Sequence, residues 1–243
     1  MYNYKNSKAN VINILKSPTD IERRDSIPSE DSEFTYENGV ICWTSAVFID
    51  IKNSTELFKN HDEKLARLMR AFTSEIITIL QKSENYRQIG IRGDCVYGIY
   101  STSKNQDLYD IYIIAAYINT FMNMFNKIIV NYGYKNITAG IGLGCDEELI
   151  IKAGRSGTGI NDKIWIGKAV IDASNLSSIT NRNGFRSIGM SQTFYEKIKN
   201  FDDVEKSFSK SSSQDFYNKK QFFYQGNLVL KKMNQWIENG MKE

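Results

Sequence analysis

The chain has 243 residues, of which 41% are hydrophobic and 24% charged, so it can bury one sizeable core and is expected to form one domain with appended segments. Its 31 basic and 28 acidic residues are well mixed, and the net charge of +3 argues against a nucleic-acid or membrane-surface protein. The three cysteines lack C-x-x-C spacing and there is one histidine, so neither a zinc site nor a disulfide framework is expected.

The first forty residues predict an appended segment rather than core. Residues 3–16 have the pattern of a short amphipathic helix, and residues 17–38 hold both prolines among many charges, which is typical of an extended arm. We expect Asn38-Gly39 to turn the chain into the first strand of the domain. Residues 1–16 lack a signal-peptide pattern and the longest apolar stretches fall short of the roughly 20 residues that span a bilayer, so a cytoplasmic location is expected.

The most informative stretch is the apolar run of residues 46–51, which is interrupted only by Asp50. A carboxylate at the exit of a buried strand needs a partner, and a divalent metal is one such partner; a lysine or a turn cap is the simpler alternative. The polar cluster at residues 53–55 predicts a helix start, where backbone N–H groups favour an anion. Residues 56–84 then show the spacing of one helix with a single buried stripe.

A second unit follows at residues 87–101, where two β-rich runs meet at Gly93-Asp94 in the pattern of a hairpin. A helix at residues 108–132 and two strands at 137–145 and 148–154 complete the order strand, helix, hairpin, helix, strand. This order predicts an α+β fold of the ferredoxin-like type, an antiparallel sheet with helices packed on it. It brings Asp94, otherwise explicable as a turn residue, beside Asp50, and two converging carboxylates predict a bound divalent pair.

The remaining chain alternates loops with short elements. We expect a polar glycine-rich loop at 155–162, a short strand at 164–167, a helix from Lys168, a strand at 185–190, a helix at 191–199, a mobile excursion at 201–220, a closing edge strand at 221–224 and a final helix at 228–241. The chain is thus divided into an N-terminal helix and arm at 1–39, a catalytic domain at 40–200, and a C-terminal segment at 201–243.

Two motifs carry a resemblance to a known family. Phe48-x-Asp50-Ile51-x-x-Ser54-Thr55, followed by Gly93-Asp94 between two strands, resembles the metal-binding signature of class III nucleotidyl cyclases. The run at residues 150–162 with Trp165-x-Gly167 is similar to one branch, the pyrimidine nucleotide cyclases of bacterial Pycsar antiphage defence. Together the matches cover about residues 26 to 180.

The resemblance implies a homodimer with active sites at the subunit interface. Asp50 and Asp94 would bridge two Mn²⁺ or Mg²⁺ ions per site, with the backbone carbonyl of Ile51 completing one coordination shell. The residues assigned to the nucleoside triphosphate by this resemblance are Phe48, Asn53, Ser54, Thr55, Arg92 and Lys168. Arg92 is equally well explained as a solvated strand end.

The chain also departs from the conventional purine cyclases. Ile171 and Asn175 stand where those enzymes carry an Asn and a transition-state Arg, and Gly90 stands where they carry a purine-reading Lys. Arg155 is the first choice for the missing catalytic cation, with Lys168 and Arg182 as further candidates. An ion pair between Arg155 and Asp162 that only ties the loop is the alternative.

The expected activity is that of a uridylate cyclase, which converts UTP to 3′,5′-cyclic UMP and pyrophosphate; a cytidylate cyclase is the runner-up. A cyclase-like domain that binds nucleotide without turnover is the alternative from another class. The product of the enzyme would be read by a separate effector that a cyclic nucleotide activates. No nucleic acid or membrane partner is expected.

Overall fold

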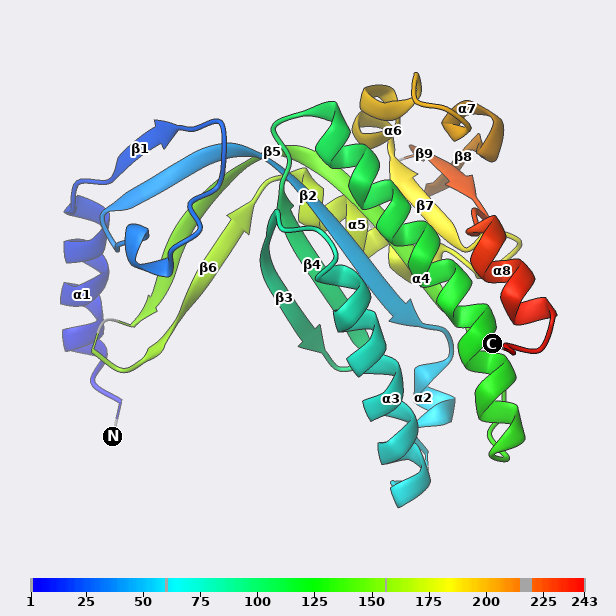
Figure 1. Cartoon of the computed structure of the whole chain (residues 1–243). Helices are drawn as coiled ribbons and strands as arrows, with labels where there is room; N and C mark the ends of the chain where they lie inside the picture. Colours follow the sequence, from blue (N-terminus) through cyan, green and yellow to red (C-terminus); the bar gives the residue numbers. More distant parts are fainter. Residues whose placement is uncertain (1, 60, 156, 215–219, 243) are drawn as a thin grey trace.

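A computed structural model describes residues 2–59, 61–155, 157–214 and 220–242 (Figure 1). Its strands are β1 Asp20–Arg23, β2 Asn38–Ile51, β3 Tyr86–Arg92, β4 Cys95–Ser101, β5 Ala139–Arg155, β6 Ile160–Ile166, β7 Ile188–Ser191, β8 Phe208–Gln214 and β9 Lys220–Gly226. Its helices are α1 Tyr4–Lys16, α2 Ser54–Leu57, α3 Glu63–Leu80, α4 Asn105–Asn131, α5 Lys168–Ile179, α6 Gln192–Ile198, α7 Val204–Ser207 and α8 Lys231–Glu238, with a 3-10 turn at Asp31–Glu33.

One mixed sheet organises the chain. Its strand order is β3-β4-β2-β5-β7-β9-β8, with β1 paired to β2 and β6 paired to β5 outside this path. The first four strands are antiparallel neighbours connected through α3 and α4, which is the ferredoxin-like arrangement. The α+β fold and the hairpin at Gly93-Asp94 are therefore confirmed.

The main core lies between the sheet and the helices α3 and α4, which cover one of its faces (Figure 1). Helix α3 buries a stripe at four-residue spacing, Leu68, Phe72, Ile76 and Leu80. Helix α4 is long and apolar enough to cross a bilayer by length and composition, contrary to the sequence-based expectation. Half of its most apolar window is buried inside the protein, as expected for a core helix.

Helix α5 packs on the opposite face of the sheet at unusually short range. A Cβ on Gly142 would lie 1.9 Å from the carbonyl oxygen of Ala173, and a Cβ on Gly144 would lie 2.0 Å from that of Ala169. Glycines on β5 therefore allow the α5 backbone to contact the strand directly. This contact fixes α5 beside the strands that carry the candidate site.

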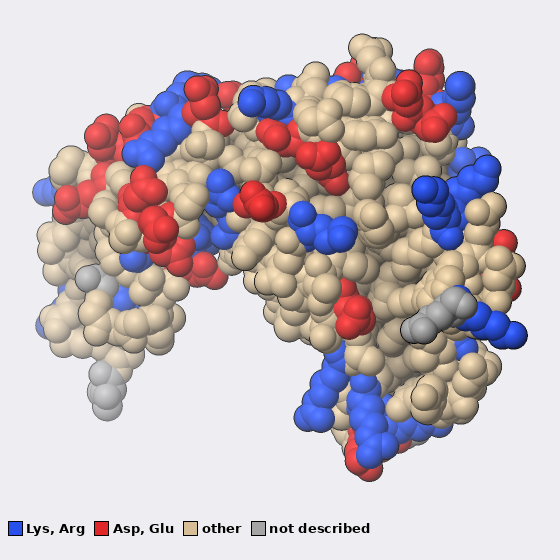
Figure 2. Space-filling model, in the orientation of Figure 1, with Lys and Arg blue, Asp and Glu red and all other residues tan. Residues whose placement is uncertain are grey.

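An arm projects from the body of the molecule. It consists of α1, β1, the 3-10 turn, the first residues of β2, the end of β5 and the strand β6 (Figure 1). The arm has a small core of its own, Ile27, Phe34, Val40, Cys42 and Ile150, with Trp165 packed against it. The space-filling view shows the molecule hollowed between the arm and the body (Figure 2).

Several sequence-based boundaries in the N-terminal half were wrong. Residues 17–38 are not outside the core, because Ile27 and Phe34 are buried in the arm. Asn38-Gly39 begins β2 instead of forming the turn, since both residues pair with other strands. The helix predicted over residues 56–84 is divided into α2 and α3, and Asp62 caps α3 by accepting a hydrogen bond from the Leu65 amide at 2.7 Å.

The C-terminal half also differs from expectation. The two strands predicted at 137–145 and 148–154 are one strand, β5, because β2 continues to pair with it opposite the polar residues 146–148. Strand β9 is not an edge strand, since β8 pairs on its outer side. The excursion predicted at 201–220 contains α7 and β8 instead, and its residues 215–219 lie outside the described part of the chain.

Candidate functional site

The two predicted metal-binding carboxylates come together as expected. Asp50 is the last residue but one of β2 and stands opposite Cys95 in the antiparallel pairing with β4. Asp94 lies in the tight turn just before Cys95, and Gly93 provides the positive φ of 65° that this turn requires. The register of β2 and β4 thus places both carboxylates at one edge of the sheet.

The side chain of Asp50 is 23% exposed, which makes its charge costly. Burial raises the pKa of the Asp50 carboxyl; the ion pair with Arg182 lowers it, and the charge of Asp94 raises it again. A cation near Asp50 would stabilise its ionised carboxylate against both burial and the charge of Asp94.

The ligands offered here suit a hard divalent ion. The described residues contain no group of three or more His, Cys, Asp or Glu side chains that could hold a metal. The site has instead two carboxylates and the carbonyl oxygen of Ile51, and oxygen donors with open positions for substrate phosphates are typical of Mg²⁺ and Mn²⁺. Burial raises the pKa of the neighbouring Cys95 thiol to about 12, so this sulfur stays protonated.

A helix begins after β2, as predicted from residues 53–55, but it is much shorter than expected. Asn53 has a left-handed backbone with φ 56°, and Ser54 and Thr55 begin the helix α2, which has only four residues. Such a short helix lacks the sustained dipole of a helix N-terminus. Asn53, Ser54 and Thr55 therefore border the site as turn residues, without the long anion-binding helix that the sequence suggested.

The face of the sheet that carries Asp50 continues into an aromatic wall. Phe48 stacks on Tyr97 with ring centroids 5.0 Å apart. A Cβ on Gly90 would lie 2.4 Å from the Tyr97 ring, so this ring crosses β3 where Gly90 leaves room. In the sheet, Tyr97 pairs with Phe48 on one side and with Gly90 on the other. This row lies two residues along the strands from the row formed by Asp50, Cys95 and Arg92, so both rows share one face.

A polar contact then joins this wall to the arm. Trp165 donates a hydrogen bond from Nε1 to Oε1 of Gln88 at 2.5 Å, and Gln88 Nε2 donates to Asp162 at 3.3 Å. The sequence analysis missed Gln88 and Tyr97. The alternation of side chains between the two faces of a strand could have indicated them. Gln88 lies on the same face of β3 as Arg92, and Tyr97 lies on the same face of β4 as Cys95.

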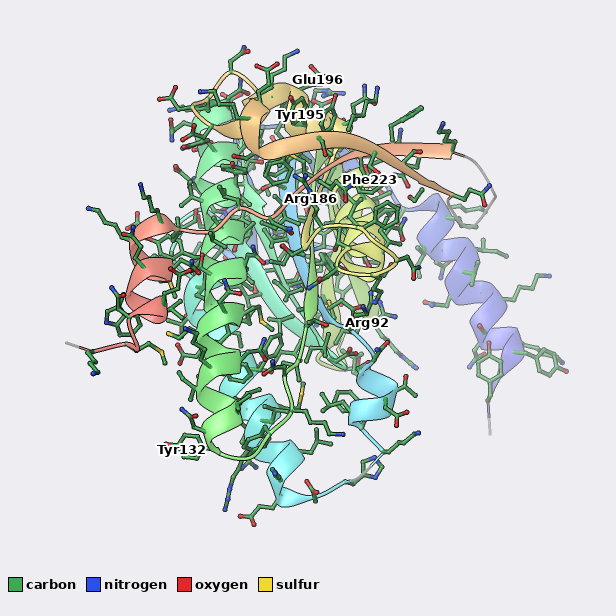
Figure 3. The ribbon with its side chains drawn as sticks, turned by 90° about the vertical axis from the view of Figure 1, so that its right-hand side faces the viewer. Arg92, Tyr132, Arg186, Tyr195, Glu196 and Phe223 are labelled. Carbon is green, nitrogen blue, oxygen red and sulfur yellow. The ribbon has the colours of Figure 1, made fainter. Side chains whose placement is uncertain are left out.

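The predicted basic residues are only partly brought together. Arg92 is the last residue of β3, directly before the turn at Gly93-Asp94, and it is exposed (Figure 3). Lys168 is the first residue of α5 and is also exposed. Arg155 lies at the tip of the arm opposite Ile160, at the far end of the strand whose Gly140 pairs with Asp50. Within one chain Arg155 is therefore remote from Asp50.

The ion pair predicted as the alternative for Arg155 is not found among the described residues. Asp162 instead accepts hydrogen bonds from Gln88 and from the Lys163 amide. Ile171 is 58% exposed on α5, on the side of the helix away from the sheet that Ala169 and Ala173 contact. Of the three positions that differ from the purine cyclases, Ile171 thus lies on the outward side of α5, Asn175 lies one turn further along this helix, and Gly90 lies on β3.

Arg182 is the cation that the structure places at the carboxylates. Its Nη2 donates to Oδ2 of Asp50 at 2.8 Å and to the carbonyl oxygen of Ile51 at 3.2 Å. Of the three basic residues considered for the missing catalytic cation, only Arg182 contacts Asp50 in the described part of the chain.

Comparison with known proteins identifies relatives that match almost the whole chain. The chain is 41% identical over 241 residues to a uridylate cyclase of Treponema porcinum, covering 99% of this chain and 82% of that protein. It is 30% identical over 254 residues to a uridylate cyclase of Gulbenkiania mobilis, covering 98% and 96%. No family model matches the sequence.

Solved structures show the same fold at low identity. The crystal structure of the adenylyl cyclase CyaB from P. aeruginosa superposes with a TM-score of 0.63 and 20% identity, covering 77% of this chain and 95% of that one. Such a likeness establishes the fold, whereas the choice of substrate depends on the residues of the site.

Proposed function

Since the chain belongs to the uridylate cyclases, within the class III nucleotidyl cyclase fold, we propose that it converts UTP to 3′,5′-cyclic UMP and pyrophosphate at Asp50 and Asp94. The observation that supports this reaction most directly is the register of β2 and β4, which joins the two carboxylates at one edge of the sheet. In the reaction, the 3′-oxygen forms a bond to the α-phosphorus. The bond from that phosphorus to the bridging oxygen breaks, pyrophosphate leaves, and the hydroxyl proton passes to solvent.

The residues of this chain supply positions for each part of the substrate. Asp50, Asp94 and the Ile51 carbonyl would hold two Mn²⁺ or Mg²⁺ ions, and the bound ions would supply a lower pKa for the 3′-hydroxyl and a positive charge opposite the departing pyrophosphate. Arg92 and the turn at 53–55 face the phosphates, and Phe48 with Tyr97 offers an apolar wall to the sugar and base. Lys168, at the start of α5, is a further phosphate contact.

We also propose that the active enzyme is a homodimer. The arm and α5 expose apolar side chains that one chain leaves uncovered, Ile160, Ile164, Ile166 and Ile171. A second copy would cover them and bring the distant Arg155 to the partner's carboxylates. Arg155 keeps its proposed catalytic role only in this arrangement.

The setting of the reaction is proposed on the family resemblance. The enzyme would act in the cytoplasm as the second-messenger synthase of a Pycsar antiphage system, and a separate effector would bind its cyclic nucleotide. Phage infection of cells that carry the chain should then raise cyclic UMP, measured by mass spectrometry, while cells that carry the Asp94→Asn variant show no rise. Equal nucleotide levels in both strains would contradict this setting.

The test of the activity is a comparison of the four nucleoside triphosphates. Purified protein with Mn²⁺ should produce cyclic UMP from UTP, identified by mass, and much less product from CTP, ATP or GTP. Asp202→Asn, a change of an exposed carboxylate, is the control and should retain activity. Binding of UTP without product would favour the alternative function, a nucleotide-binding module, which the isoleucine at 171 and the asparagine at 175 make worth testing.

A further inference from the structure

Arg182 donates hydrogen bonds to two of the oxygen atoms that would hold a divalent ion. The same nitrogen, Nη2, lies within hydrogen-bonding distance of a carboxylate oxygen of Asp50 and of the Ile51 carbonyl oxygen. These are two of the three oxygen groups proposed above as metal ligands, so the inference depends on that proposed function. An ion held by both oxygens would compete with the Arg182 guanidinium for them, and its positive charge would repel that of the guanidinium.

The ion pair is built into the fold and is not a chance surface contact. The side chains of Arg182 and Asp50 are only 21% and 23% exposed. The other guanidinium nitrogen, Nη1, donates to the carbonyl oxygens of Ser177, at 3.3 Å, and of Ser178. Both carbonyls belong to the last turn of α5, where a helix has unpaired acceptors and favours a cation.

The loop that carries Arg182 is also fixed. Asn181 has a left-handed backbone with φ 56°. Its amide donates to the Arg186 carbonyl at 2.8 Å, and its side chain donates to the Ala139 carbonyl at 3.1 Å. These bonds fix the backbone next to Arg182. From there, the guanidinium connects two elements: Nη1 donates to carbonyls at the end of α5, and Nη2 donates to Asp50 and Ile51 at the end of β2.

We infer that Arg182 is an internal counter-cation that holds Asp50 in place until a divalent ion displaces it. Metal entry removes Nη2 from Asp50 and Ile51, while Nη1 keeps the side chain attached to α5. Two consequences follow. Arg182 stabilises the metal-free chain, because it pairs a partly buried carboxylate, and it weakens metal binding, because the ion must break that pair.

The test is a Mn²⁺ titration by calorimetry, without nucleotide and with 3′-deoxy-UTP, which lacks the attacking hydroxyl. Arg182→Gln should bind Mn²⁺ at least about fivefold more tightly than the unchanged protein and should have a lower Tm in EDTA. Arg186→Gln, in the same loop (Figure 3), is the matched control, since it removes the same charge. Among the described residues, the Arg186 side chain makes no ion pair. This variant should change neither quantity.

A conservative variant covers a failure of Arg182→Gln to fold. Arg182→Lys keeps the charge, but a single ammonium group cannot reach Asp50 and the α5 carbonyls together, so it should also bind Mn²⁺ more tightly than the unchanged protein. Equal or weaker Mn²⁺ binding by the folded variants would overturn the inference. That result is distinct from a failure of the proposed function, in which the unchanged protein binds no Mn²⁺ in either titration.

Discussion

The body and the arm differ in how completely each buries its apolar side chains within one chain. The body encloses a large core between the sheet and the helices α3 and α4, and this core fixes the ends of β2 and β4 where Asp50 and Asp94 meet. The arm has five buried core residues, and the outer side of β6 leaves Ile160 75% exposed. One chain can therefore position the two carboxylates, whereas the arm leaves apolar side chains uncovered, which the proposed second copy would cover.

This contrast predicts that substitutions at the carboxylates have the largest effect. Asp50→Ala or Asp94→Asn should lower kcat by more than about 10²-fold, because metal stabilisation of charge contributes several kcal/mol. Turnover of UTP with Mn²⁺ is the measurement, with folding verified by circular dichroism. Near-normal turnover in either folded variant would disprove the assignment of both carboxylates.

The next largest effect is a pH dependence of stability that arises where the arm meets the body. Glu148 is fully buried on β5 where the arm leaves the body, and its Oε1 accepts the Ala169 amide of α5 at 2.7 Å. Burial raises the pKa of Glu148 from 4.5 to about 7, although hydrogen bonds from the α5 backbone lower it. The folded chain therefore binds this proton more tightly than the unfolded chain, and stability falls as pH rises from about 4.5 to about 7.

Glu148→Gln removes this titration. Its free energy of unfolding should exceed that of the unchanged protein by about 3 kcal/mol at pH 8 and be nearly equal at pH 4.5, measured by urea denaturation. Glu147→Gln is the control, since that neighbour is 41% exposed and pairs with Arg23 at the surface. The same pH dependence in Glu148→Gln and in the unchanged protein would refute this origin of the effect.

A charged residue introduced on the arm tests whether the arm forms the proposed dimer interface. Ile164 is 46% exposed in one chain, so Ile164→Glu should leave the Tm of the monomer nearly unchanged but place an unpaired charge in the proposed interface. We expect a monomer by light scattering and about tenfold lower activity at micromolar protein. Val130→Glu, at a 51% exposed residue of α4 in the body, should remain dimeric and active. A dimeric, active Ile164→Glu protein would remove the arm from the interface.

The smallest expected effect is a partial recovery of activity in mixed dimers. It tests whether Arg155 acts at the carboxylates of its own chain or at those of the partner chain. Dimers mixed from Asp50→Ala and Arg155→Ala chains contain one complete site per mixed dimer if Arg155 reaches across. Half of the dimers are mixed, so about a quarter of the full activity should return. No recovery would exclude a site composed from both chains, and full activity of Arg155→Ala alone would exclude any catalytic role.

Local patterns in the sequence were sufficient for much of the fold. Three features were predicted correctly: the turn at Gly93-Asp94, the helical spacing that buries Leu68, Phe72 and Ile76, and the helix at 191–199. In the structure this last helix is α6, and Ser191 caps it by accepting a hydrogen bond from the Phe194 amide at 3.3 Å. Each depends on residues within a few positions of one another. The convergence of Asp50 and Asp94 was also predicted, because the order of the elements determines which strand ends are neighbours.

Other features depend on partners that are distant in the sequence. Strand β5 continues through residues 146–148 because β2 supplies hydrogen bonds along its whole length, although the polar residues there resemble a break. Ile27 and Phe34 are buried because β5 and β6 fold over a segment that reads as an exposed arm.

The cation beside Asp50 is the clearest feature that the sequence alone could not predict. The sequence by itself indicated the two carboxylates, since their strand and turn contexts are local, but for the missing cation it favoured Arg155 over Lys168 and Arg182. Only the tertiary structure joined Arg182 to Asp50 across 132 residues and placed Arg155 at the far end of β5. The physical reason is that the end of α5, held against glycines of β5, determines where that guanidinium lies, and no short-range pattern records such packing.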